Sequence, residues 1–125
     1  MNSELILGSN GGGLNKCVSV SPSELTYNVP YTVQCDFDPQ YVIVYAQDTT
    51  HYGSTGNGLY VMECDVVNDY EHLFQSNYTS ASTNFMRTLS NTGADQKIVK
   101  NGGQISYIPI STVFASFYTR ICIFG

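Results

Sequence analysis

The sequence has no tryptophan, only two histidines and few charged residues. Five Lys or Arg stand against ten Asp or Glu in 125 residues, so the formal net charge is −5. A nucleic-acid-binding surface needs Lys and Arg to contact phosphates, and this composition therefore excludes a polybasic nucleic-acid binder. A long helical bundle or coiled coil is also disfavoured, because such chains are rich in Ala, Glu, Lys and Leu.

Long apolar runs are absent as well. No stretch approaches the roughly 18 to 20 consecutive apolar residues that a membrane-spanning helix needs. The first eight residues lack a positively charged segment, and their apolar run is too short for a secretory signal peptide. We therefore expect a chain made in the cytoplasm, without classical secretion or insertion into a membrane.

The four cysteines contain no Cys-x-x-Cys pair, which argues against a zinc ribbon or a thioredoxin-like site. An even count permits two disulfides in three pairings. The missing signal peptide instead favours free thiols. Cys35, Cys64 and Cys122 lie in apolar, strand-like runs, where a free cysteine behaves as a small buried hydrophobe; the fourth is Cys17.

Polar residues without charge are what the sequence has in abundance. Ser, Thr and Asn together number 34, and tyrosine adds 10 more. Hydrophobic residues make up 42% of the chain, so a disordered polymer is not expected. The length fits one domain whose surface is polar mainly through hydroxyl and amide groups.

Short β-branched and aromatic runs separated by turn residues dominate the chain from residue 16 onward. They predict strands over residues 17–20, 31–35, 41–46, 58–67, 85–89, 97–100, 104–111 and 113–124. Residues 70–74 fit either a strand or one helical turn. The spacing indicates an all-β antiparallel sandwich, of jelly-roll or Greek-key type, with seven to nine strands and little or no helix.

Local signals add detail to this prediction. The continuous run over residues 41–46 is typical of a strand covered on both faces. Asn101-Gly102 predicts a hairpin with a type I′ turn. Pro109 predicts an edge strand or a bulge. Residues 75–83 are polar and predict a loop.

The domain organisation that follows is simple. Residues 1–15 form a flexible N-terminal segment or an edge strand with a Gly-rich joint, and residues 16–125 form one β-sandwich domain. Residues 1–72 carry a net charge of −8 and residues 73–125 carry +3. This asymmetry fits either charge pairing within the domain or contact between subunits.

Groups that could carry catalysis or bind metal are sparse. His51 and His72 could recruit Asp48, Asp69 or Glu71, but their spacing fits no metal-ligand pattern, and we expect neither a metal nor a cofactor. Asp36 and Asp38 flank Phe37, which predicts a buried ring between two solvated carboxylates. We therefore expect no enzyme. The alternative is a small glycan-active hydrolase that uses Asp36, Asp38 and His51.

Tyrosine suits a recognition surface, because it supplies large contact area at low entropy cost. The loops at 47–57 and 75–83 combine tyrosine with amide and hydroxyl groups. The candidate binding residues in and beside them are Asp48, His51, Tyr52, Asn57, Asn77 and Tyr78.

Two strings carry a family resemblance. Tyr31-Thr-Val33 followed by Phe37-Asp-Pro-Gln-Tyr-Val-Ile-Val-Tyr45 resembles the F-x-P-x-x-V-x-V segment of small β-sandwich modules in phage and prophage tail proteins. A similar string opens the H-type lectin fold. Residues 103–108 resemble the penultimate strand of such phage modules.

The resemblance implies a non-enzymatic virion component, often trimeric, that contacts a host-surface glycan or neighbouring subunits. We therefore expect a homo-oligomer, with a trimer favoured, assembled into a virion. A purely architectural oligomerisation domain is the remaining alternative.

Overall fold

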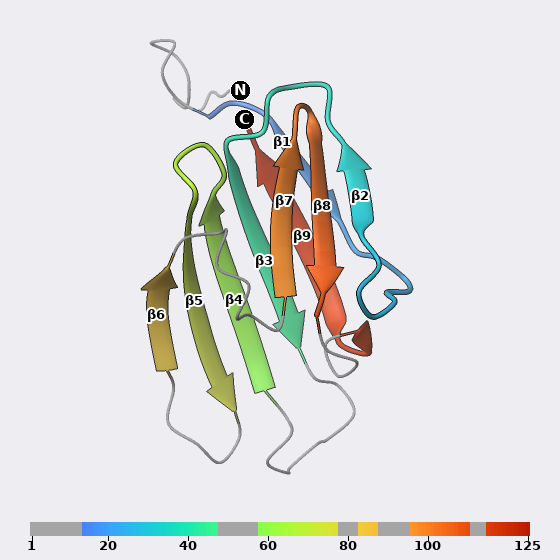
Figure 1. Ribbon diagram of the computed structural model, residues 1–125, viewed down its shortest axis with the longest axis vertical. Coiled ribbons are helices and arrows are strands. Elements are labelled where there is room, and N and C mark those ends of the chain that lie inside the picture. Colours follow the sequence, from blue (N-terminus) through green and yellow to red (C-terminus); the bar gives the residue numbers. More distant parts are fainter. Residues whose placement is uncertain (1–13, 48–57, 78–82, 88–95, 111–114) are drawn as a thin grey trace.

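The computed structural model describes residues 14–47, 58–77, 83–87, 96–110 and 115–125, and these form an all-β sandwich. Nine antiparallel strands build two sheets in these segments, which confirms the predicted fold class (Figure 1). Within the described part of the chain, no helix is long and apolar enough to cross a membrane. The strands are β1 (Cys17–Val20), β2 (Tyr31–Gln34), β3 (Tyr41–Gln47), β4 (Gly58–Asp65), β5 (Tyr70–Asn77), β6 (Thr83–Arg87), β7 (Gln96–Asn101), β8 (Gln104–Pro109) and β9 (Tyr118–Phe124).

The two sheets differ in size. The larger has the order β1-β9-β3-β4-β5-β6, and the smaller has the order β2-β8-β7. The small sheet lies over β3, β9 and β1, so β4, β5 and β6 extend beside it (Figure 1). The main core fills the space between the sheets with fully buried side chains from both, among them Val42, Met62, Ile121, Ile105 and Tyr107.

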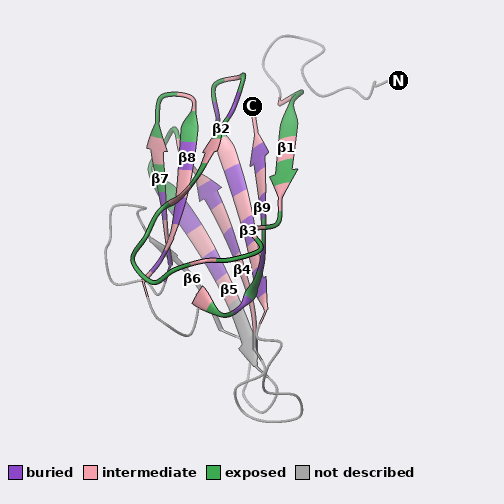
Figure 2. Cartoon of the chain, turned by 90° about the vertical axis from the view of Figure 1, so that its right-hand side faces the viewer, coloured by how far each residue is buried: buried purple, intermediate pink, exposed green. Residues whose placement is uncertain are grey.

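Strand β3 lies in the middle of the large sheet but is buried on one face only. Val42, Val44 and Ala46 are fully buried, while the alternating residues Tyr41, Ile43, Tyr45 and Gln47 are partly exposed (Figure 2). The prediction of a strand covered on both faces is therefore wrong. The β-branched and aromatic residues at the outer positions hide the alternation, because they are as apolar as the inner ones.

The predicted hairpin at Asn101-Gly102 is present, with a different turn. Asn101 pairs with Gln104, so Gly102 and Gly103 form the two-residue loop between β7 and β8. Among the glycines of the described segments only Gly102 has a positive φ, at 60°. This matches a type II′ turn, in which glycine occupies the first central position, and not the predicted type I′.

The edge position predicted from Pro109 is wrong, because β8 is the central strand of the small sheet. Pro109 is nevertheless compatible with that place. It is the last residue of β8 and pairs with Gln96 of β7, whereas β2 stops pairing at Tyr107. The missing N–H of proline therefore falls where the β2 ladder has already ended.

Several boundaries also shift. Residues 70–74 belong to strand β5, which settles the choice between strand and helical turn. The predicted loop at 75–83 is too long, since β5 continues to Asn77 and β6 begins at Thr83. Strand β9 begins at Tyr118 and not near residue 113. Polar residues at the end of β5 and the start of β6 conceal these two extensions, because backbone pairing continues through them.

The two ends of the described domain are hydrogen-bonded to each other. The backbone N–H groups of Asn15 and Lys16 donate to the Gly125 carbonyl at 3.1 and 2.9 Å, and the Gly125 N–H donates to the Lys16 carbonyl at 3.0 Å. Just beyond these bonds, Cys17 of β1 pairs with Phe124 of β9. The first and last residues of the described domain therefore lie side by side.

A buried polar pair lies inside the small sheet. The Tyr107 hydroxyl donates to Gln96 Oε1 at 2.7 Å, and both residues are almost fully buried. The Gln96 Nε2 group has no hydrogen-bond partner among the described residues. Burial raises the pKa of Tyr107 above its ordinary value.

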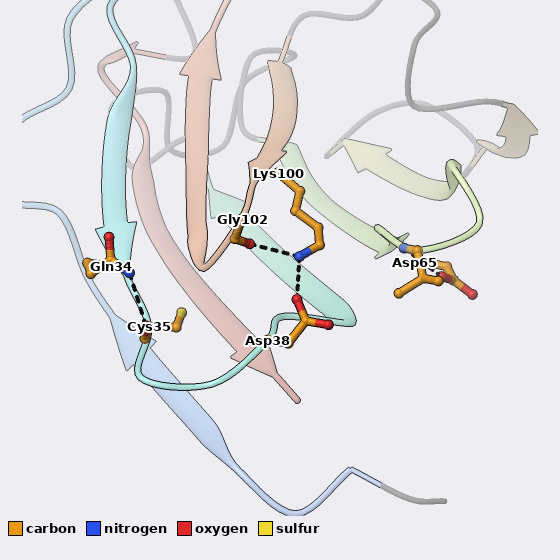
Figure 3. Close-up of polar contacts among 7 residues, drawn as sticks. Gln34, Cys35, Asp38, Asp65, Lys100 and Gly102 are labelled. Atoms are coloured by element: carbon orange, nitrogen blue, oxygen red, sulfur yellow. Dashed lines mark hydrogen bonds and ion pairs between the residues drawn. The ribbon is translucent and has the colours of Figure 1, made fainter.

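The two aspartates that flank Phe37 lie on the surface of the domain. Asp36 and Asp38 are exposed in the segment between β2 and β3, as predicted, whereas Phe37 is only partly buried and packs against the core. The Lys100 ammonium donates to Asp38 Oδ1 at 2.6 Å and to the Gly102 carbonyl at 2.8 Å (Figure 3). This ion pair joins the acidic and basic parts of the sequence within one domain.

All four cysteines are free thiols. Cys35 and Cys64 are buried, as predicted, whereas Cys122 is only partly buried. Burial raises the pKa of Cys35, with the nearby Asp36 charge adding to the effect and Lys100 opposing it. A thiol with a raised pKa is a poor nucleophile at neutral pH.

Candidate binding face

The outer faces of the two sheets differ in chemistry. On the small sheet the outward positions are mostly polar, and the Thr32 and Ser106 hydroxyls lie 2.9 Å apart in a cross-strand hydrogen bond. The outward residues of this sheet are Thr32, Gln34, Lys97, Val99, Asn101, Gln104, Ser106 and Ile108. This is the composition of an ordinary solvated sheet face.

The outer face of the large sheet is rich in aromatic and aliphatic side chains instead. We call it the open face, because none of the described strands covers it. On the four strands from β9 to β5 its residues are Tyr118, Arg120, Cys122, Phe124, Tyr41, Ile43, Tyr45, Gln47, Leu59, Val61, Glu63, Asp65, Tyr70, His72 and Phe74. Such a face is more typical of a contact surface than of a solvated one.

Two aromatic pairs connect β3 to β9 across the open face. The Tyr41 and Phe124 rings lie with centroids 6.4 Å apart and tilted by 51°. The Tyr45 and Tyr118 rings are also 6.4 Å apart, in an edge-to-face arrangement at 78°. These geometries hold the rings in defined orientations and leave Tyr118 exposed by 44%.

At one end of this face five side chains line a shallow cavity of about 220 Å³. We call it the acidic cavity; its lining residues are Tyr41, Glu63, Asp65, Tyr70 and His72. The ladder explains the convergence, since Tyr41 is directly opposite Asp65, Asp65 is opposite Tyr70, and Glu63 is opposite His72. A second cavity of about 220 Å³ adjoins it, lined by Leu14, Gln40, Tyr41, Asp65, Val67 and Asn68.

Polar contacts orient the side chains of the acidic cavity. His72 Nδ1 lies 3.4 Å from Glu63 Oε1. Burial raises the pKa of Tyr41, and the negative charges of Glu63 and Asp65 together with a hydrogen bond to Glu63 raise it further. Tyr41 therefore stays protonated and can donate its hydroxyl hydrogen.

Asp65 has a structural task as well. Its Oδ1 accepts the backbone N–H groups of Val67 and Asn68 at 3.1 and 3.0 Å, and its Oδ2 accepts the Asn68 side-chain amide at 2.9 Å. These bonds, led by those from Asn68, hold the pKa of Asp65 below its usual range. The carboxylate is thus ionised and fixed at the β4–β5 turn (Figure 3).

The candidate residues chosen from the sequence are not the ones that line this cavity. Asp48, His51, Tyr52, Asn57 and Tyr78 lie outside the described residues, and Asn77 is the last residue of β5, paired with Gly58. The loops at 47–57 and 75–83 therefore stay predictions for the most part.

The structure also separates the histidine and carboxylates proposed for a metal. His72 lies on the open face, whereas the adjacent Glu71 is buried on the opposite face of the sheet. Asp69 lies in the β4–β5 turn with a φ of 58°. Among the described residues no group of three His, Cys, Asp or Glu could hold a metal ion.

The sequence contains a signal for the acidic cavity that a search along loops misses. Glu63 and Asp65 are two residues apart on β4, and Tyr70 and His72 are two residues apart on β5. A spacing of two places side chains on the same face of a strand. The turn at Asn68-Asp69 then predicts that the two pairs lie side by side.

No protein-family model matches the chain, and no curated protein matches its sequence. A structural comparison gives the tailspike protein gp49 of Acinetobacter baumannii bacteriophage Fri1, described as a capsular polysaccharide depolymerase. The TM-score is 0.33 at 13% identity, over 88% of this chain and 17% of that chain. A TM-score of 0.33 assigns neither a shared fold nor a shared activity.

Proposed function

We propose that this protein is a non-enzymatic binding module of a phage or prophage tail and that it binds a glycan at the acidic cavity. The observation that carries the proposal is the grouping of Tyr41 and Tyr70 with Glu63 and Asp65 on the open face, which none of the described strands covers. Tyrosine rings offer flat apolar surfaces to the C–H faces of a sugar. Carboxylates accept hydrogen bonds from sugar hydroxyls. The phage context comes from the resemblance in sequence.

Glycan-array screening followed by calorimetry tests this proposal. Tyr70 is 46% exposed, so Tyr70→Ala removes a ring without emptying the core. We expect this variant to lower affinity about tenfold, which corresponds to the loss of one good stacking contact. Tyr27→Ala is the matched control, because Tyr27 is 50% exposed and its neighbour Asn28 donates its N–H to the Pro109 carbonyl of the small sheet. Absence of any glycan signal for the parent protein would refute the proposal.

The middle of the open face favours a second function, contact with neighbouring subunits. Ile43, Val61 and Phe74 lie there beyond the acidic cavity, and Tyr45 continues the apolar surface toward β9. Packing of this region against another copy would bury apolar area and leave the cavity at the end of the face accessible.

Light scattering coupled to size exclusion tests the subunit contact. We expect an oligomer, with a trimer favoured by the resemblance, that dissociates in the variant Val61→Glu. A charge introduced on the polar face of the small sheet, Thr32→Glu, is the control and should leave the mass unchanged. A monomer in the parent protein at micromolar concentration would refute this second function.

A further inference from the structure

We infer that the acidic cavity prefers a sugar with a free, positively charged amino group over neutral and acidic sugars of the same size. This inference names the ligand class for the proposed glycan site and rests on that proposed function. It is carried by the negative charge of the cavity lining, by its two tyrosine rings and by the position of those rings on either side of the carboxylates.

The charge of the cavity lining is negative. Glu63 and Asp65 supply two carboxylates, and His72 is the one basic side chain among the five lining residues, charged only when protonated. The side chain of Glu63 is 45% exposed, so an incoming ligand can reach it. A cationic group is attracted here, and a uronate or sialate carboxylate is repelled.

Two basic side chains of the described segments, Lys100 and Arg120, are engaged elsewhere. Lys100 is held by Asp38 at the β7–β8 turn of the small sheet. Arg120 donates to the Ser19 hydroxyl at 2.7 Å and lies opposite Tyr45 on β3. That position is four residues, or about 13 Å, along the strand from Tyr41, so Arg120 lies outside the cavity lining.

The two tyrosines reinforce the same preference. The face of an aromatic ring attracts a cation through its quadrupole, most strongly within about 6 Å of the ring centre. Tyr41 and Tyr70 lie on either side of the carboxylates in the cavity lining. A protonated amino group on a sugar could therefore contact a carboxylate while the sugar ring lies against a tyrosine.

Three probes of equal length test the inference: oligosaccharides of glucosamine, of N-acetylglucosamine and of glucuronic acid. Calorimetry at pH 6.5 and low salt should show glucosamine binding about tenfold more tightly than N-acetylglucosamine, and glucuronic acid binding more weakly than either. The preference should shrink as salt is raised, because exposed charges are screened.

The variant Glu63→Gln isolates the charge, since it keeps the shape of the side chain. We expect it to reduce the preference for glucosamine over N-acetylglucosamine to about threefold, because it removes one of the two carboxylates of the cavity. Glu24→Gln, an exposed glutamate between β1 and β2, is the matched control and should retain the full preference.

The outcomes separate the inference from the proposed function. Equal or tighter binding of N-acetylglucosamine would overturn the amino preference while the glycan site stands. An unchanged preference in Glu63→Gln would place the amino group outside the acidic cavity and would also overturn the inference. Failure of all sugars, on the array and in calorimetry, would refute the proposed function itself.

Discussion

Removal of one hydroxyl group from the core should cost this protein a large share of its stability. In Tyr107→Phe the buried Gln96 Oε1 loses its donor at 2.7 Å, and the Nε2 group of the same amide already has no partner among the described residues. A buried acceptor that loses its donor costs about 1–3 kcal/mol. We expect a loss of about 2 kcal/mol in the free energy of unfolding.

Urea denaturation followed by tyrosine fluorescence and circular dichroism measures this loss. Tyr45→Phe is a matched control, because the Tyr45 hydroxyl also donates to a glutamine Oε1, that of Gln47, but at 3.4 Å and in a partly exposed position. Water can replace that donor, so the control should lose about 0.5 kcal/mol or less.

The double variant Gln96→Leu with Tyr107→Phe extends the test. Replacing both partners by apolar groups of similar shape removes every unsatisfied atom of the pair, so it should be more stable than Tyr107→Phe alone. A Tyr107→Phe protein within 0.5 kcal/mol of the parent would refute the role of this hydrogen bond. The same holds if the loss of stability in the double variant equals the sum of the losses measured for Tyr107→Phe and Gln96→Leu singly.

Alkaline pH gives an independent check on the same side chain. The pKa of Tyr107 is raised above 10.0, so the folded state keeps a proton that the unfolded state loses. The resulting stability is fully present below about pH 10 and is lost as pH rises further. The unfolding midpoint of the parent should therefore fall more steeply above pH 10 than that of Tyr107→Phe.

Other perturbations test the turns and the ion pair. Asp65→Ala should lower stability by about 1 kcal/mol at pH 7, because it removes three hydrogen bonds at the β4–β5 turn. Since the folded pKa of Asp65 is lowered, this difference should disappear as pH falls below about 4, as thermal melts can show. Gly102→Ala should lower stability by about 1 kcal/mol through its φ of 60° alone, because an added Cβ meets nothing within 4 Å. Gly102→Asn should lower stability by less, and equal losses for the two variants in urea titrations would contradict this reasoning. Lys100→Met should cost about 0.5 kcal/mol at low salt and nothing measurable at 1 M salt, whereas Lys97→Met on the same strand should show no such salt dependence.

The fold was accessible from the sequence because strand formation depends on local alternation and on turn residues. Cys17–Val20 and Gly58–Asp65 appear close to their predicted bounds. The hairpin at Gly102 was also found, although its turn type depends on which residues pair at the end of the ladder. The edge position predicted from Pro109 was wrong, because the absence of a backbone N–H in proline does not tell where the neighbouring strand stops pairing.

The candidate binding face was harder to predict, because its residues come from four strands. Tyr41 reads as a core residue in sequence, and its place beside Asp65 depends on the register of β3 with β4. Register is a property of paired strands, so one strand alone cannot supply it. Attention to polar loops instead selected residues such as Tyr52, which lies outside the described residues.

The hydrogen bonds that join Lys16 to Gly125 have a mechanical consequence. Because β1 and β9 are antiparallel, a pull on the two ends of the domain acts on the same end of their ladder, at Cys17 and Phe124. The bonds between these strands then bear the load one after another and open like a zipper, instead of sharing it in shear. Tension applied through both ends would therefore separate β1 from β9 at low force. Tension applied between one end and a distant contact on the open face would not load the bonds of this ladder one after another.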